Sequence, residues 1–270
     1  MISSNPGKIL LFFAHPDDET SSCGGTINKY SKLGSQVYIC TATNGNKGDL
    51  GTGDLKLTRE ELGPYREKEE LKVLKSLGAY DVLQLGYDDQ CLELLENGVL
   101  EQQFLNILKK IQPNIVITFG QRGFSGHTDH IQVNINATNA FNKYVTIYSA
   151  QNIRLFYTAM PKLIAEKREM DLSEEEKSPT IGIDISDTWG NKVAGLRMYK
   201  SQRDAQEIAN MFETMYQGDS IDNYGESREE ILQLFESLKN YGYTSNPTEY
   251  FHQYYPKLEN YNGTILSNRF

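Results

Sequence analysis

The sequence predicts an α/β fold in which a doubly wound, mostly parallel sheet is flanked by helices. The first observation is that short apolar runs alternate with amphipathic stretches along residues 8–160. Several of these runs are continuously apolar, which is typical of parallel strands covered on both faces. The second observation is that segments rich in His and Asp directly follow two of the runs. Ligand sites of doubly wound sheets lie at such strand ends.

The first half of the chain contains five predicted strands and four predicted helices. The strands are expected at residues 8–14, 36–42, 81–87, 114–120 and 152–159. The helices are expected at residues 23–34, 58–78, 99–113 and 131–144, where apolar residues recur at helical spacing. In the second of these helices, Leu71, Leu74 and Leu77 are expected on one face, and Gly78 marks the end.

The second half is less regular. Residues 180–186 predict one more strand, and residues 187–202 predict a helix with Asp187 as its cap. The charge run at 166–177 is interpreted as a solvated loop or helix edge, and residues 241–256 show no clean period. Without a repeat or an evident linker, we expect a single domain over 1–270, with its core at 8–160 and a C-terminal elaboration at 161–270.

Composition limits the classes of partner. The 270 residues are 39% hydrophobic and 23% charged, with a net charge of −9, which argues against a nucleic-acid surface. No apolar stretch reaches the roughly 18 residues of a membrane span, and the N-terminus lacks the pattern of a signal peptide. The widely spaced Cys23, Cys40 and Cys91 predict reduced thiols and a cytoplasmic protein.

Two clusters of His and Asp suggest a metal site. The segment HPDDE, which contains His15, Asp17 and Asp18, follows the first strand, and GHTDH, which contains His127, Asp129 and His130, follows the fourth. Two histidines and one carboxylate would meet the ligand count of a catalytic zinc site. Of the neighbours Asp17 and Asp18, one can bind the metal while the other acts as a general base on the bound water. The alternative is that Asp17, Asp18 or Thr20 only caps the next helix.

The same motifs resemble the zinc-dependent de-N-acetylases of the PIG-L/LmbE family. AHPDDE after an N-terminal strand and GHTDH about 110 residues later carry the resemblance, supported by YREKE and QLGYDD. The resemblance covers residues 8–145, with a weaker echo at KSQ, residues 200–202, and implies a Rossmann-like domain. It implies three zinc ligands, His15, Asp18 and His130.

The resemblance also implies the roles of the residues around the metal. Asp17 would be the general base, and His127 would stabilise the tetrahedral intermediate and protonate the leaving amine. Asp129 would orient or tune His127. Contacts to the substrate are expected from Arg66 and from Asp88 or Asp89.

Three positions depart from the family pattern. Thr128 stands where many relatives have proline, which concerns only the turn. Ser125 replaces a tyrosine that in some members assists the oxyanion. Tyr199 replaces a histidine before SQ, which puts substrate contacts from that region in doubt.

These observations lead to the expectation of a zinc-dependent hydrolase that removes an N-acetyl group from an amino sugar or its conjugate. The alternatives are a metal-dependent hydrolase of another amide or ester and a non-catalytic protein that binds sugar conjugates. His and carboxylate ligands would also accept iron, cobalt or manganese. Residues 44–54 could form a lid over the metal or a solvated loop, and nothing in the sequence chooses among the various homo-oligomers of the family.

Overall fold

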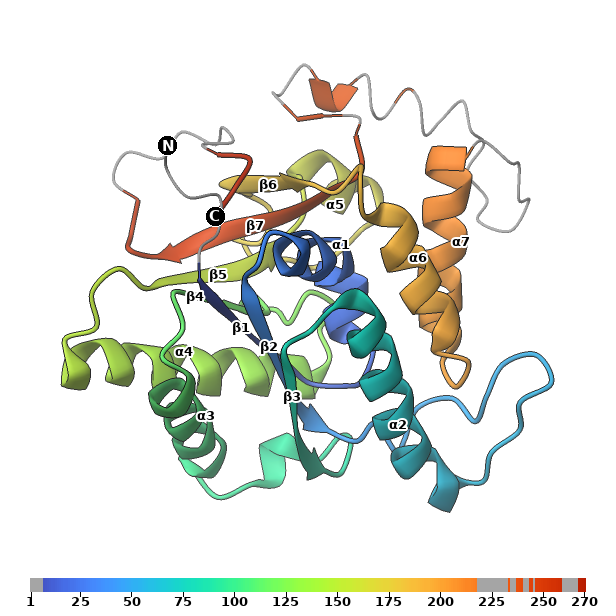
Figure 1. Ribbon diagram of the computed structural model, residues 1–270, viewed down its shortest axis with the longest axis horizontal. Helices are drawn as coiled ribbons and strands as arrows, with labels where there is room; N and C mark the ends of the chain where they lie inside the picture. The colour runs from blue at the N-terminus through green and yellow to red at the C-terminus, as the bar shows by residue number, and fades with distance from the viewer. Residues whose placement is uncertain (1–6, 218–232, 234–236, 240–242, 245, 259–266) are drawn as a thin grey trace.

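The computed structural model describes residues 7–217, 233, 237–239, 243–244, 246–258 and 267–270. Its centre is a seven-stranded sheet with the strand order β3-β2-β1-β4-β5-β7-β6 (Figure 1). Five strands run parallel: β1 (Lys8–Phe13), β2 (Gln36–Thr43), β3 (Asp81–Tyr87), β4 (Ile115–Thr118) and β5 (Arg154–Ala159). The predicted mostly parallel α/β fold is therefore confirmed.

The far edge of the sheet is formed by the C-terminal half of the chain. Strand β7 (Thr248–Tyr255) is antiparallel to both of its neighbours, β5 and β6 (Ile181–Asp184). It lies in the segment for which the sequence showed no clean period, because Tyr, His and Gln alternate there with only two buried side chains, those of Glu249 and Phe251.

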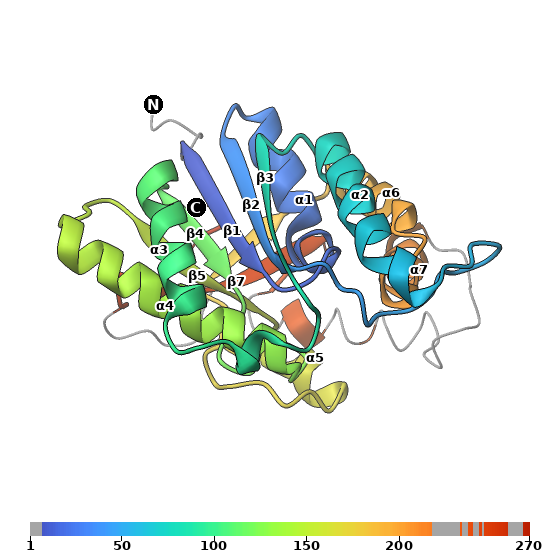
Figure 2. The ribbon, with the colours of Figure 1, turned by 90° about the horizontal axis from the view of Figure 1, so that it is seen from below.

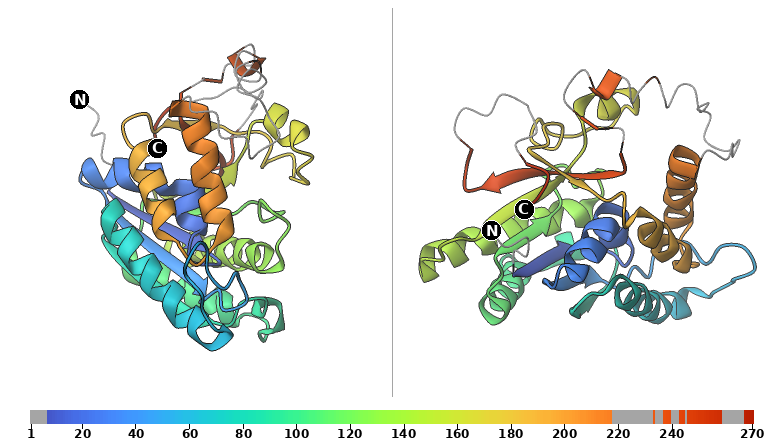
Figure 3. Two further views of the ribbon diagram at one scale, coloured as in Figure 1. Left: turned by 90° about the vertical axis from the view of Figure 1, so that its right-hand side faces the viewer. Right: turned by 45° about the horizontal axis from the view of Figure 1, so that its top comes forward.

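Helices cover both faces of the sheet (Figure 2). On one face lie α3 (Val99–Ile111) and α4 (Thr128–Tyr148). On the other lie α1 (Asp18–Lys32), α2 (Arg59–Leu77), α6 (Trp189–Met198) and α7 (Arg203–Gln217). Two short helices are η1 (Leu92–Leu94) and α5 (Lys162–Lys167), and α5 belongs to the segment that connects β5 to β6 and projects from the body of the molecule (Figure 3).

Several boundaries differ from the sequence predictions. Helix α1 begins at Asp18 instead of residue 23, so the acidic cluster is its first turn. Helix α6 begins at Trp189 after Thr188, and Asp187 does not cap it. On α2, Leu74 and Leu77 are buried but Leu71 is 44% exposed. Helices α5 and α7 were not predicted.

The topology brings the two His/Asp segments together. Strands β1 and β4 are neighbours, with Leu11 opposite Ile117, so the segments that leave their carboxyl ends start side by side. The side chains of both strands are buried on both faces along almost their whole length. No helix of the described residues is long and apolar enough to cross a membrane.

Candidate metal centre and catalytic pocket

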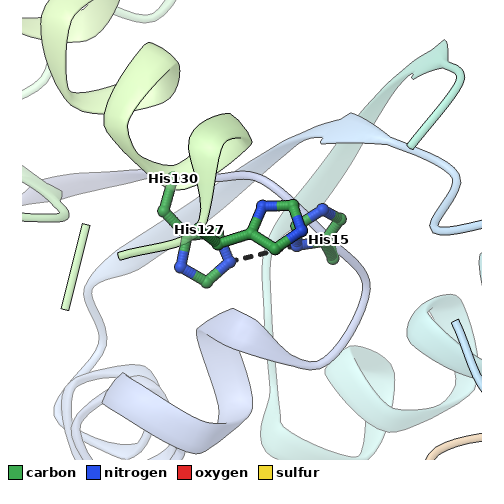
Figure 4. Close-up of side chains that lie close together, drawn as sticks. All are labelled: His15, His127 and His130. Atoms are coloured by element: carbon green, nitrogen blue, oxygen red, sulfur yellow. Dashed lines mark hydrogen bonds between the residues drawn. The ribbon is translucent and has the colours of Figure 1, made fainter. Parts of the chain in front are cut away.

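Residues separated by more than 110 positions meet at the carboxyl ends of β1 and β4. His15 leaves β1, and His127 and His130 stand at the start of α4. Figure 4 shows the three imidazole rings grouped together, with Nδ1 of His15 3.1 Å from Nε2 of His130. Ring atoms of all three histidines lie within 4.8 Å of one another.

Asp18 completes a set of three donors. One oxygen of its carboxylate lies 3.3 Å from Nδ1 of His15, and the other lies 3.3 Å from Nε2 of His130. Two ligands held about 2.1 Å from one tetrahedral ion stand roughly 3.3 Å apart, so these spacings fit a zinc-sized cation. The donor set therefore fits a divalent metal of the first transition row.

The other ring nitrogen of His15, Nε2, faces two buried carboxylates. Its Nε2 lies 2.9 Å from Oδ1 of Asp89 and 3.3 Å from Oδ2 of Asp129. A proton on Nε2 serves both carboxylates and leaves the Nδ1 lone pair free for a cation. Burial alone would lower the pKa of His15, but hydrogen bonds with Asp129, Asp18 and Asp89 raise it well above its usual value.

Asp129 and Asp89 thus fix the orientation of the His15 ring through its Nε2. The Asp129 carboxylate also accepts the N–H groups of Gln90 and Leu92. Besides this contact with His15, the backbone N–H of Asp129 donates to Nδ1 of His127, and the charge of its carboxylate raises the pKa of His127. Asp89 was expected to contact substrate, but it is buried behind His15. Burial raises the pKa of Asp89, and the hydrogen bond and charge of His15 outweigh that effect and lower it to about 2.

His130 is fixed in one tautomer by the loop before α4. Its Nδ1 lies 2.9 Å from the carbonyl oxygen of Gly123 and 3.0 Å from Oγ of Ser125. A carbonyl only accepts, so the proton sits on Nδ1 and Nε2 is free to bind a cation. The ring stacks on Phe119 at a centroid distance of 4.1 Å. Ser125, which departs from the family pattern, therefore holds the ring of the candidate ligand His130.

A buried carboxylate holds that loop. Glu176 is fully buried and accepts the backbone N–H groups of Arg122 and Phe124, at 3.1 and 3.0 Å. A Cβ atom added at Gly120 would lie 2.1 Å from Cγ of Glu176, so glycine permits this close approach. The sequence interpretation of 166–177 as a solvated charge run is wrong for Glu176. No local signal distinguishes it from its exposed neighbour Glu174.

Asp17 stands beside the three donors in an unusual backbone conformation, with φ 117°. Arg66 pairs with its carboxylate at 3.2 Å and also donates to the carbonyl oxygens of Pro16 and Gly45. Burial raises the pKa of Asp17 well above its usual value, against the opposing charge of Arg66. A carboxyl group with a raised pKa beside a cation site is suited to proton transfer at neutral pH.

The backbone of Asp17 is held by the buried carboxylate of Glu19. Its N–H donates to Glu19, whose other oxygen accepts the hydroxyl of Tyr199 at 2.6 Å. Tyr199 and Glu19 are fully buried, and Tyr199 does not line the pocket. Tyr199, which departs from the family pattern, therefore helps to hold Asp17 through Glu19. Because Tyr199 does not line the pocket, we assign it no contact with substrate.

His127 forms the N-cap of α4. Its Nδ1 accepts the N–H of Asp129 at 3.1 Å, so in the neutral ring the proton sits on Nε2. Burial and the charges of His15 and His130 lower the pKa of His127. A lowered pKa favours the neutral ring, in which Nε2 is a hydrogen-bond donor.

The remaining expected residues lie apart from one another. Arg66 lines the pocket, although its guanidinium is occupied by the contacts described above. Asp88 is exposed and accepts from Asn46 at 2.7 Å, away from the pocket lining. Residues 44–54 are tied to the segment before α7, because Thr52 donates to Lys200 and Asp49 accepts the N–H of Arg203. Only Gly48 of this loop lines the pocket.

The donors open into a pocket of about 770 Å³. At one end it is lined by His15, Asp17, Asp18, His127 and His130. Its other end is lined mainly by apolar side chains from residues 159–216. A pocket of this size suits a small organic ligand, for which roughly 300–1,000 Å³ is typical.

The fold and site define an α/β protein with a His/Asp metal-type centre at the strand ends of a mostly parallel sheet. Residues 10–141 match the model of the PIG-L family, described as GlcNAc-PI de-N-acetylase. This part of the chain is a PIG-L family domain, as the resemblance implied.

Relatives of known name agree with this family. A 1D-myo-inositol 2-acetamido-2-deoxy-alpha-D-glucopyranoside deacetylase of Salinispora arenicola is 27% identical over 197 residues, which are 66% of this chain. That match spans 64% of the relative's own length.

Two solved structures share the fold. The N,N'-diacetylchitobiose deacetylase of Pyrococcus horikoshii aligns over 91% of this chain and 83% of its own, with a TM-score of 0.64 and 22% identity. The 4-carboxy-2-hydroxymuconate hydratase GalB of Pseudomonas putida aligns over 95% and 99%, with a TM-score of 0.66 and 15% identity. One of these proteins is named as a hydrolase and the other as a hydratase, so the fold alone does not fix the reaction.

Proposed function

We propose that this chain is a zinc-dependent hydrolase that removes an N-acetyl group from an amino sugar or its conjugate and releases acetate. The observation that carries the proposal is the position of Asp17, which precedes Asp18 in the sequence and lines the same pocket as His15, Asp18 and His130, while its carboxylate pairs with Arg66 and not with the donor atoms. The relative named as a deacetylase of an acetamido sugar supports the choice of substrate.

The protein residues divide the work of hydrolysis. His15, Asp18 and His130 would hold the ion, and Asp17 would take a proton from the attacking water. A bound Zn²⁺ lowers the pKa of its water from 15.7 to about 7 and polarises the carbonyl group of the substrate. His127 would donate its Nε2 proton as a hydrogen bond to the developing oxyanion, a contact worth about 3–4 kcal/mol.

The leaving amine needs a proton before it departs. Asp17 would return the one that it took, because its buried carboxyl group has a raised pKa and retains a proton longer than an exposed one. A protein that only binds sugar conjugates needs neither a base nor an oxyanion donor. The placement of Asp17 and His127 at the donor end of one pocket therefore favours an enzyme.

Acetate release is the direct test. Purified protein is incubated with N-acetylglucosamine, N,N'-diacetylchitobiose and an N-acetylglucosaminyl inositol, and both acetate and free amine are measured. We expect equal amounts of the two products, loss of activity after chelation, and recovery with Zn²⁺. Metal-loaded protein that releases no acetate from any N-acetylated amino sugar would contradict the proposal.

A further inference from the structure

The apolar end of the pocket, here called the methionine arm, is defined by Met160, Met170, Met211 and Met215. These are four of the six methionines of the chain. None of the four is buried, although each lies in the wall of a pocket. Partly exposed apolar side chains gathered in one concavity mark a binding surface, and methionine adapts its shape to different apolar ligands.

The arm is built by elements outside the PIG-L domain. Met160 follows β5, and Met170 follows α5. On α7, residues 208, 211, 212 and 215 recur at helical spacing and line the pocket together. Ile164 and Met215 also pack on Leu238, in a small cluster separate from the main core.

The arm and the candidate metal centre are parts of one pocket. Phe119 and Phe124, from the loop that holds His130, line the same pocket as Met160. Glu176 connects the two ends, because its backbone carbonyl accepts from Met160 while its carboxylate holds the loop. The pocket therefore has room for a ligand that reaches both the donor atoms and the methionine arm.

We propose that the methionine arm binds an apolar aglycone carried by the amino-sugar substrate. This inference rests on the proposed function, because an acetyl group is too small to use the arm and the remaining apolar surface must serve another part of the substrate. An alkyl or lipid-like substituent of the sugar has the chemistry that thioether and aromatic side chains bind, and its transfer from water is favourable. The exposed Arg168, 3.2 Å from the sulfur of Met211, stands where such a chain reaches solvent.

A series of glycosides tests the proposal. The methyl, butyl and octyl glycosides of N-acetylglucosamine, as both anomers and below micelle-forming concentration, are compared by acetate release. We expect kcat/KM to rise with chain length and to be at least tenfold higher for the octyl than for the methyl glycoside of the reactive anomer. Equal values along the series would overturn the proposal.

Paired variants locate the effect. In the double variant Met211→Gln/Met215→Gln, the octyl preference should fall to threefold or less, because the amide groups keep the length of the side chain but remove its apolar character. Met198→Gln is the matched control, since Met198 is 37% exposed and lies outside the pocket, and its preference should stay at the wild-type value. A preference retained in the double variant would place the alkyl group elsewhere.

Two further experiments distinguish a failure of this inference from a failure of the proposed function. The methyl glycoside of N-octanoylglucosamine carries the chain on the acyl side, and a higher kcat/KM for it than for the octyl glycoside would overturn the choice of the aglycone. If no glycoside is hydrolysed, the proposed function fails, and calorimetry still tests the arm. The octyl glycoside should then bind the wild-type protein at least tenfold more tightly than the methyl glycoside, and equal affinities would overturn the inference.

Discussion

At the scale of single residues, the proposed site depends on which ring nitrogen of each histidine is free to face a cation. Nδ1 of His15 is the candidate donor because Asp89 and Asp129 engage its Nε2, and Nε2 of His130 is the candidate donor because Gly123 engages its Nδ1. Opposite ring nitrogens are thus directed to one point from two strands. Such supporting contacts typically change metal affinity by about 10–100-fold when they are removed.

Asp17→Asn should abolish turnover while the metal stays bound. Asparagine keeps the size of the side chain and, like aspartate, tolerates positive φ, but it cannot accept a proton from water. We expect acetate release to fall by about 10²–10⁴-fold with an unchanged zinc content by elemental analysis. Most of the activity remaining in this variant would mean that another group is the base.

His130→Ala provides the contrasting result. It removes a donor atom, so we expect the purified protein to lose zinc as well as activity. Elemental analysis of the two variants side by side distinguishes a lost base from a lost ligand. A zinc content equal to that of the wild type in His130→Ala would contradict the ligand assignment.

The grouping of His15, Asp17, Asp18 and His130 could be predicted from the sequence because these residues directly follow strand ends, and their roles as donors and base stay predictions. The periodicity located β1 and β4, and parallel strands place their carboxyl ends at one edge of the sheet. The support of Asp129 for His15 could not be found in this way. Its neighbour in sequence is His127, and its contact with His15 exists only after η1 and α4 have packed.

At the scale of elements, the position of the His130 ring depends on the loop from Gly120 to Gly126 as well as on α4, the helix that follows it. The carbonyl group of Gly123 in this loop fixes His130, and the carboxylate of Glu176 accepts two of the loop N–H groups, those of Arg122 and Phe124. The sequence could not distinguish Glu176 from the other acidic residues of the charge run. Its burial depends on contacts with the backbone of a distant loop, and these contacts leave no local pattern in the sequence.

Glu176→Ala should lower zinc affinity without touching a ligand. Two loop N–H groups lose their acceptor, and each unsatisfied buried donor costs about 1–3 kcal/mol. We expect a lower midpoint of thermal unfolding and at least tenfold weaker zinc binding in competition with a chelator. Glu174→Gln is the control, since Glu174 is exposed and pairs with Lys177 at the surface. Equal zinc affinity in both variants would contradict the role of Glu176.

At the scale of the whole molecule, stability depends on carboxyl groups that the fold keeps protonated. Glu70 is fully buried between α2 and the sheet and contacts Thr41 and Gln84. Burial, together with the charge of Glu19, raises the pKa of Glu70 to about 8. In the unfolded chain this pKa is about 4.3. Between these values the folded protein binds more protons, so the free energy of unfolding falls as pH rises.

Glu70→Gln should flatten this pH dependence. The amide reproduces the protonated carboxyl group, since its N–H can donate to Thr41 while its oxygen accepts from Gln84. We expect the free energy of unfolding of the metal-free protein, measured in urea at pH 5, 6.5 and 8, to fall less steeply than in the wild type. Glu60→Gln, at an exposed position of α2, should keep the wild-type slope. The same slope in Glu70→Gln would show that Glu70 is ionised in the folded state.

The C-terminal third was the least predictable part of the chain. Strand β7 is hard to predict because both of its faces mix polar and aromatic residues, and its pairing with β5 and β6 joins positions 64 to 100 residues apart. The methionine arm was not predicted either, because the residues that line it come from separate segments of the chain that share no sequence pattern.

The insertion of β7 between β5 and β6 has a consequence for synthesis on the ribosome. Strand β6 is translated more than 60 residues earlier than β7, yet its only neighbouring strand among the described residues is β7. Nascent β6 must therefore wait, unpaired at its backbone, until residues 248–255 emerge. An early stop codon anywhere before Thr248 would remove both strands from the sheet at once.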